Sequence, residues 1–248
     1  MKNLLVFIVS FAIIGCATKR VEEHSQSELN HFVLSIALVG PAIQNAIGSI
    51  KQDTLKSASH NLSVEDTQKL ILISKKAFSP LKAYKRVHAR ALQTISREDT
   101  VSIAKKLNED SYREFSEKLI ELYKNEGYSK VVKAMKDLDE EKMTLDMEKA
   151  ILAEKISRHS MNFNVLKILF NKMGNGSKVE ELLYRQSMFV LTYLAIEDMD
   201  QSEIEGILRV RQDPTWSKYQ KAFEQSIGQS YDEFFFELRK YNESKFSS

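Results

Sequence analysis

Residues 216–223 read WSKYQKAF and residues 128–135 read YSKVVKAM, so the two segments agree at four of eight positions. The match extends upstream without gaps through a polar turn, an amphipathic segment and an acidic start; the turns are Asn125-Glu126-Gly127 and Asp213-Pro214-Thr215. Two amphipathic helices joined by a tight turn form an αα-hairpin. The sequence therefore predicts a duplicated αα-hairpin, with copies at 109–135 and 197–223. Unrelated hairpins would also share some Lys and Ala, because both are common in helices.

The composition around these hairpins is that of an all-α protein. Only 8 Gly and 3 Pro occur in 248 residues, whereas 43% of residues are apolar and 28% are charged. Few turn-forming residues and no alternating apolar pattern argue against strands. We expect seven to nine amphipathic helices, no significant sheet, and a single all-helical domain at 28–248.

Five Ser-x-x-acid sequences predict where helices begin. A hydroxyl three residues before a carboxylate is the capping-box arrangement or its aspartate variant. The five pairs are Ser63/Asp66, Ser111/Glu114, Ser177/Glu180, Ser202/Glu205 and Ser230/Glu233. Pro80 and Pro214 are placed to open helices as well, because proline fits the first helical turn.

The most apolar stretch after the first 30 residues is FVLSIALVGPAIQNAIGSI at 32–50, which carries no charge. Its large apolar residues recur at steps of three and four, and Pro41 interrupts the backbone hydrogen-bond ladder. This pattern predicts a buried, proline-kinked core helix. A membrane-inserted helix is the alternative.

The only cysteine, Cys16, follows an apolar run from Leu4 to Ile14 that is preceded by Lys2. About eleven uncharged residues suit the apolar part of a signal peptide and are too few to span a membrane. The residues Ile13-Ile14-Gly15-Cys16 resemble the lipobox of bacterial lipoproteins. Otherwise, Cys16 is a small apolar residue near an ordinary cleavage site.

The lipoprotein resemblance implies a cleaved signal peptide at 1–15 and a lipidated tether at 16–27. Cys16 would then carry a covalent diacylglycerol and an N-acyl lipid, which together anchor the protein stably to a membrane. Ala17 stands where an aspartate would signal retention in the inner membrane. The resemblance thus implies a location at the outer membrane, lipid-anchored and facing the periplasm, and no other cofactor.

The C-terminal third also resembles a family of exported helical bacterial proteins of unknown function. The residues that carry this resemblance are Tyr193, Ser202, Glu205, Asp213, Pro214, Lys218 and Tyr219. Trp216 departs from the family pattern, which has a glycine there. The resemblance implies a helical fold and export, and no chemistry.

Neither charge nor motifs point to catalysis or to nucleic acid. The net charge is +2, from 36 basic and 34 acidic residues mixed along the chain, so we expect no nucleic-acid partner. The five histidines are scattered singly, without the spacing of a metal site. We expect no metal and identify no catalytic residue, so an enzyme is disfavoured.

Aromatic residues near the C-terminus suggest an interaction surface at Phe234, Phe235, Phe236 and Tyr241. They cover more of a helix circumference than one core-facing stripe requires. Alternatively, they belong to a final helix wedged between the two hairpins.

The sequence favours a non-catalytic helical interaction or envelope-support module, with an envelope protein or a second copy as partner. The alternative is an envelope hydrolase or small-ligand carrier with a pocket between the helical repeats. The aromatic and apolar residues proposed to line that pocket are Phe163, Leu166, Phe170 and Phe189.

Overall fold

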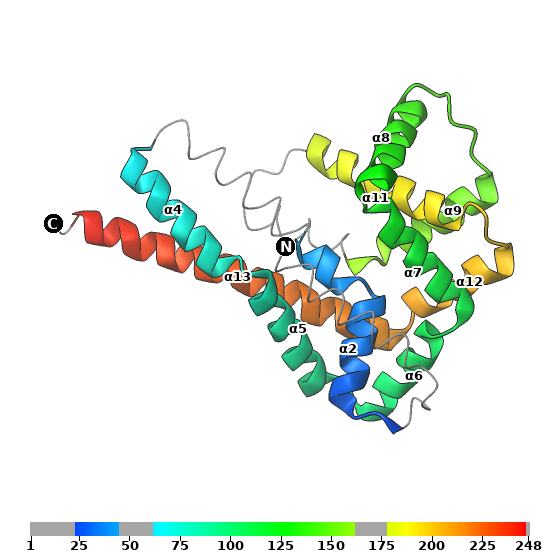
Figure 1. Cartoon of the computed structure of the whole chain (residues 1–248), viewed down its shortest axis with the longest axis horizontal. Coiled ribbons are helices and arrows are strands. Elements are labelled where there is room, and N and C mark those ends of the chain that lie inside the picture. The colour runs from blue at the N-terminus through cyan, green and yellow to red at the C-terminus, as the bar shows by residue number, and fades with distance from the viewer. Residues whose placement is uncertain (1–22, 45–61, 162–177, 247–248) are drawn as a thin grey trace.

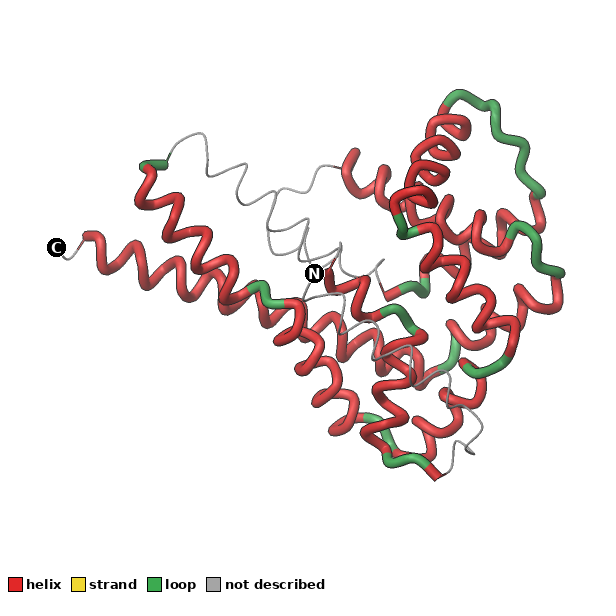
Figure 2. The backbone as a smooth tube through the Cα atoms, in the orientation of Figure 1, coloured by secondary structure: helices red, strands yellow, loops and turns green. Residues whose placement is uncertain are grey.

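The computed structural model describes residues 23–44, 62–161 and 178–246. At least ten α-helices and no strand lie in these ranges, which confirms the all-α prediction (Figure 2). The expected number of seven to nine helices is too low, because short connections such as Ser79 and Ile95-Ser96 divide the helical sequence into more elements. The helices are α2 (Gln26–Ile36), α4 (Val64–Ala77), α5 (Pro80–Thr94), α6 (Arg97–Leu107), α7 (Asp110–Leu122), α8 (Asn125–Asp139), α9 (Met147–Arg158), α11 (Lys178–Ile196), α12 (Gln201–Arg211) and α13 (Pro214–Phe246).

The long helix α13 runs across one side of the molecule, as Figure 1 shows. Its buried residues recur every three or four positions from Trp216 through Tyr219, Phe223 and Ile227 to Tyr231. This spacing places them on one face, which packs against α4, α5 and α6. Each such large side chain contributes about 1.5–3 kcal/mol when fully buried, so this stripe fixes α13 to the body of the protein.

Helix α2 packs on α5 and α6, whereas α7, α8 and α9 pack around α11 and α12 at the other end of the molecule. Helix α11 contacts α7, α8 and α9, and α12 contacts α7 and α9. The main core is continuous from α2 to α13, whereas a smaller cluster around Val131 and Met188 joins α8 to α11.

The two predicted hairpins both consist of two helices joined by two residues. Helices α7 and α8 are linked by residues 123–124, and α12 and α13 by residues 212–213. The second helices differ, because α8 ends at Asp139 whereas α13 continues to Phe246. The helix pairs lie where the sequence places them, and their origin by duplication stays a prediction.

The expected helix at 32–50 is interrupted before Pro41. Helix α2 ends at Ile36, Leu38 takes a left-handed backbone conformation (φ 55°), and residues 39–44 are helical again. Pro41 thus lies in the first turn of the next helical segment, where its missing N–H is tolerated. No helix in the described ranges combines the length and hydropathy needed to cross a bilayer.

Some predicted helix starts are confirmed. The Ser63 hydroxyl accepts a hydrogen bond from the Asp66 N–H (3.1 Å) at the start of α4, and Pro80 opens α5 behind the cap residue Ser79. Pro214 opens α13. The pair Ser177/Glu180 includes a residue outside the described ranges.

Three other predicted starts are wrong. Ser111 lies inside the first turn of α7, whose N-cap is Glu109, and α12 begins at a capping box formed by Asp200 and Glu203 rather than at Ser202. Ser230 lies in the middle of α13, where its hydroxyl donates to the Ser226 carbonyl oxygen (3.4 Å). Because serine can satisfy its hydroxyl within a helix in this way, the Ser-x-x-acid pattern alone does not define a helix start.

The expected tether at 16–27 also overlaps with ordered structure. Ser25 and Glu28 form a capping box, and α2 begins at Gln26. The helical body therefore starts slightly before the predicted boundary at residue 28.

Candidate functional site: a buried arginine beside an apolar cavity

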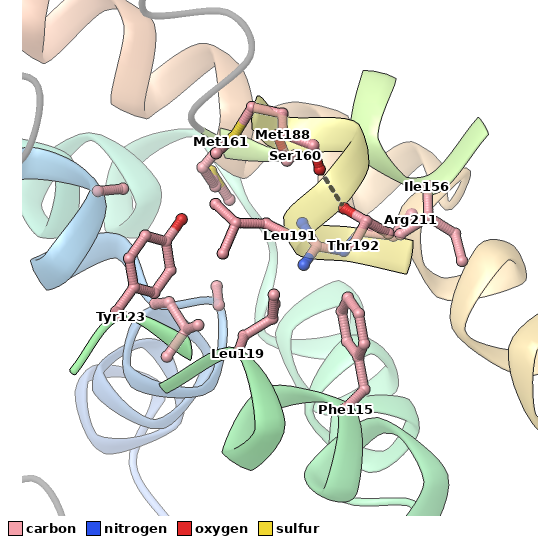
Figure 3. A pocket seen from close by; sticks show the side chains of 13 residues that line it. Phe115, Leu119, Tyr123, Ile156, Ser160, Met161, Met188, Leu191, Thr192 and Arg211 are labelled. Atoms are coloured by element: carbon pink, nitrogen blue, oxygen red, sulfur yellow. Dashed lines mark hydrogen bonds between the residues drawn. The ribbon is translucent and has the colours of Figure 1, made fainter. Parts of the chain in front are cut away.

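A cavity of about 30 Å³ lies between the first helices of the two hairpins, α7 and α12, and is closed by the end of α9 and by α11 (Figure 3). Its size allows about two water molecules or a small chemical group. Most of its wall is apolar. The lining residues are Ala37, Leu38, Ala42, Phe115, Leu119, Tyr123, Ile156, Ser160, Met161, Met188, Leu191, Thr192 and Arg211.

Arg211, in the last turn of α12, is the one charged residue of the lining and is only 4% exposed. Its guanidinium carbon lies 4.4 Å from the ring centre of Trp216. The rings of Tyr112 and Phe115 are at 5.6 and 5.7 Å. Cation–π attraction to these rings replaces part of the hydration that the buried guanidinium has lost.

Two polar partners face the guanidinium, the hydroxyl of Tyr112 and the carbonyl oxygen of His159. Nη1 of Arg211 donates to the carbonyl oxygen of His159 at 3.5 Å, and Nε is buried without a partner. The same oxygen already accepts shorter hydrogen bonds from Nε1 of Trp216 (2.9 Å) and Nε2 of Gln220 (2.7 Å). Because His159 caps the C-terminus of α9, its carbonyl carries the partial negative charge of the helix end. That partial charge and the side chain of Tyr112 offset part of the cost of burying Arg211.

Within the described ranges, no carboxylate forms an ion pair with Arg211. Burial lowers the pKa of Arg211, and the neighbouring Tyr112 and Tyr123 offset part of that change. An arginine side chain stays protonated in proteins, so the charge is permanent. A buried charge without a carboxylate partner costs several kcal/mol, so Arg211 is an incompletely compensated group of this core.

The other polar groups of the lining are the hydroxyls of Tyr123, Ser160 and Thr192. Thr192 Oγ1 donates to the carbonyl oxygen of Met188 (2.8 Å), a hydrogen bond drawn in Figure 3. Met161, Met188 and Leu191 contribute apolar surface to the same lining. The site therefore joins one permanent positive charge to an apolar surface.

The sequence predicted a pocket between the repeats, but the described lining differs from the one expected. Phe189 packs on Tyr193, with ring centres 6.1 Å apart, and is not part of the cavity wall. Phe163, Leu166 and Phe170 lie outside the described ranges, as does Cys16.

Arg211 was missed by the sequence analysis, although the sequence carries a signal for it. Ile204, Ile207 and Arg211 follow at steps of three and four, and the two isoleucines are fully buried. A basic residue that continues the apolar face of an amphipathic helix must be buried with it.

The proposed aromatic interaction surface is divided between core and solvent. Phe234 is 5% exposed and packs against Phe78, and the Tyr241 hydroxyl donates to Asp66 (2.7 Å), so these two residues stabilise the contact of α13 with α4. Phe235 and Phe236 are 39% and 55% exposed. Only these two remain available for a partner.

The residues that carry the resemblance to exported helical proteins mostly hold the fold together. The Tyr193 hydroxyl accepts from the Asp146 N–H (3.0 Å), and Lys218 forms an ion pair with Asp99 (2.6 Å). Asp213 accepts from the Thr215 N–H (2.7 Å) at the start of α13 and pairs with Lys106.

The described histidines form no metal site, and in these ranges no three His, Cys, Asp or Glu side chains gather as metal ligands. His31 and His88 stack with ring centres 3.9 Å apart, and Nδ1 of His31 shares a hydrogen bond with the Tyr84 hydroxyl (3.2 Å). This arrangement joins α2 to α5.

Comparisons with protein families, with characterised proteins and with solved structures found no match to this chain.

Proposed function

We propose that this protein binds a small ligand, without catalysis, in the cavity between α7 and α12. One observation carries the proposal: Arg211 lines an apolar cavity, is buried, and has no carboxylate partner in the described ranges. Concave apolar sites with a few well-placed polar groups are the usual form of small-molecule sites.

A purely structural role explains Arg211 less well. The carbonyl oxygen at the end of α9 is already satisfied by Trp216 and Gln220, both at shorter distances than Arg211. A neutral side chain of similar length would fill the same volume without the cost of a buried charge. A ligand that accepts hydrogen bonds from the guanidinium would explain why a charged residue is buried at this position.

We propose that the protein acts at a bacterial outer membrane and faces the periplasm, held by lipid on Cys16. The support is the lipobox-like sequence Ile13-Ile14-Gly15-Cys16, with Ala17 after it. Two or three acyl chains would make the attachment permanent.

An interaction module is the second candidate function, with an envelope protein or a second copy as partner. The exposed rings of Phe235 and Phe236 favour it, because large exposed apolar side chains next to each other suit a docking surface. This function has less support than ligand binding, because Phe234 packs against Phe78 and Tyr241 is hydrogen-bonded to Asp66, so neither side chain is available to a partner.

Native mass spectrometry of the protein released gently from its own membrane tests these proposals. We expect the wild type and Arg209→Met, an exposed position on the same helix, to retain a small molecule that Arg211→Met loses. A protein retained in place of a small molecule would instead favour the interaction module. If no species carries either, ligand binding is wrong.

The same mass spectra of the protein released from its membrane test the proposed lipid anchor on Cys16. We expect the wild-type mass to include the lipid and the signal peptide to be missing, and Cys16→Ser to lack the lipid. A wild-type mass without lipid would show that the lipoprotein assignment is wrong.

A further inference from the structure

The C-terminal half of α13 has an exposed side that carries both aromatic rings and charges. Phe235 and Phe236 are 39% and 55% exposed, and Asp232 and Arg239 are exposed as well. Steps of three and four residues from Asp232 through Phe235 to Arg239 place these side chains in one line along the helix. We call Asp232, Phe235, Phe236 and Arg239 the outer stripe of α13.

The contacts of α13 with α4 and α5 lie on another side of the helix. Glu233 forms an ion pair with Lys82 (2.6 Å), and Glu237 forms one with Lys76 (3.1 Å). At 3.6 residues per turn, Glu237 lies about 200° around the helix from Phe235. In Figure 1, α4 and the end of α13 run side by side, away from most of the other helices. The outer stripe is therefore not used by these two neighbours.

The charges next to the stripe differ in whether they are already neutralised. Glu233 and Glu237 are paired with basic side chains of α5 and α4. Arg239, in contrast, forms no ion pair within the described ranges. An acidic partner opposite Arg239 would therefore not have to displace an existing ion pair.

A second copy of the same helix supplies such a partner in one orientation. In an antiparallel pair whose twofold axis passes between Phe235 and Phe236, residue 232 of each copy lies level with residue 239 of the other. Asp232 then faces Arg239 twice, once on each side of a central cluster of four phenylalanine rings. Packed helices are about 8–10 Å apart, a distance that an aspartate and an arginine side chain bridge.

The parallel orientation is unfavourable for the same residues. It would place Asp232 opposite Asp232 and Arg239 opposite Arg239, and like charges that face each other across an interface repel. The order of the charges along the stripe thus selects the antiparallel pair.

We propose that two copies of the protein pair in an antiparallel manner through the outer stripes of α13, with Phe235 and Phe236 at the centre and Asp232–Arg239 ion pairs at both sides. The proposal names the partner of the second candidate function and rests on that function, whereas it does not require ligand binding. The stripe is short, so the association is weak in solution. Attachment of both copies to one membrane would raise their effective concentration.

Exchange of the charges tests the pairing. The experiment uses the full-length chain with Cys16→Ser, which carries no lipid, in a mild detergent, and measures association by sedimentation equilibrium. We expect this parent chain to form a reversible dimer. Asp232→Arg and Arg239→Asp each convert two attractive contacts into two repulsive ones, and should weaken the dimer at least tenfold. The double variant Asp232→Arg/Arg239→Asp restores both attractions and should associate like the parent.

Two controls separate this pairing from other effects of charge. A mixture of the two single variants should form a mixed dimer, because each supplies the charge that the other lacks. Arg209→Asp, at an exposed position of α12, makes the same change in net charge and should associate like the parent. The apolar segment at 4–14 is identical in every variant, so association through it would not respond to these substitutions.

The orientation is measured with a spin label on Lys221→Cys, an exposed position of α13, in the same Cys16→Ser chain. In the antiparallel pair, the levels of the two labels differ by about 29 residues, so we expect them to lie about 44 Å apart. A parallel pair would bring them to about 10–20 Å. Double electron–electron resonance distinguishes these distances.

Each contrary result overturns a stated part of the proposal. A parent chain that stays monomeric up to about 1 mM would overturn self-association, and native mass spectrometry of the membrane-released protein decides independently whether a different protein docks. Folded single variants that associate like the parent, or a folded double variant that does not, would overturn the ion pairs. A short distance between the labels would overturn the antiparallel orientation.

Discussion

The guanidinium of Arg211 stacks on Trp216, and both side chains donate to one acceptor, the carbonyl oxygen of His159. This pair joins the end of α12, the start of α13 and the end of α9. It also places the largest fully buried side chain of the described core, Trp216, against a buried charge.

Replacement of Arg211 by methionine should separate a binding role from a structural one. If the charge serves a ligand, its removal relieves an uncompensated buried charge, and we expect the free energy of unfolding to rise by about 1 kcal/mol or more. Urea denaturation of the wild type and of Arg211→Met, both without ligand, measures this difference in the free energy of unfolding. A loss of 2 kcal/mol or more would instead assign Arg211 to the fold. Arg209→Met, exposed on α12, should change stability by less than about 0.5 kcal/mol.

Gly127 should tolerate no side chain. A Cβ at this position of α8 would collide with the carbonyl oxygen of Glu121 and lie 2.6 Å from Cα of Leu122. We expect Gly127→Ala to destabilise the protein by about 1–3 kcal/mol, measured by thermal and urea unfolding.

Gly228 on α13 is the matched control for Gly127. A Cβ there meets no atom within 4 Å, so Gly228→Ala should stabilise the protein by about 0.5–1 kcal/mol through helix propensity. Equal effects of the two substitutions would contradict the close approach of Gly127 to the backbone at the end of α7.

The buried hydrogen bond from the Tyr219 hydroxyl to Oδ1 of Asn30 should contribute more to the free energy of unfolding than a hydrogen bond at the surface. It joins α13 to α2, and Tyr219→Phe would leave the Asn30 oxygen without this donor. We expect a loss of about 1–3 kcal/mol. The matched variant Tyr241→Phe removes a hydrogen bond to Asp66 at the other end of α13, and should cost less. A larger loss of stability in Tyr241→Phe than in Tyr219→Phe would contradict this prediction.

Stability should fall between about pH 7 and pH 5 because of His31. Burial and, secondarily, the stacked His88 lower the pKa of His31 below 6.5. The unfolded chain therefore binds a proton near pH 6.5 while the folded protein does not, so the folded state loses stability as the pH falls below this value. His159, whose pKa is lowered by burial and by the charges of Arg211 and Arg158, acts in the same direction.

Urea midpoints measured across this range test the histidine contribution. His31→Gln should reduce the slope of stability against pH between pH 7 and 5. The carboxylates with lowered pKa values, Asp213 and Glu233, titrate below this range and do not contribute to the slope. An unchanged slope in His31→Gln would show that this stacked pair does not govern the pH response.

The parts of the fold that depend on local sequence were predictable. The all-α class follows from composition, and the starts of α4 and α5 follow from Ser63 and from Pro80, whose side chains act on their own first turn. The starts at Ser111 and Ser230 were predicted wrongly, because both serines lie within helices, and the Ser230 hydroxyl finds its acceptor in the preceding turn.

The candidate site was predictable only in outline. A pocket between the repeats was expected only for the alternative function. The lining of the cavity comes from segments that meet only in the folded chain, such as Leu38, Phe115 and Met188. The apolar spacing around Arg211 was the one local signal. What it could not reveal is that the guanidinium lies beside a cavity rather than against a carboxylate.

The length of α13 makes the two candidate functions separable. At about 1.5 Å per residue, Trp216 near its start and Phe236 near its end are about 30 Å apart along one uninterrupted helix. Residues so far apart with no shared contacts normally contribute independently to the free energy. A docked partner at the C-terminal end would thus leave access to the cavity open, and one molecule could hold its ligand and its partner at the same time.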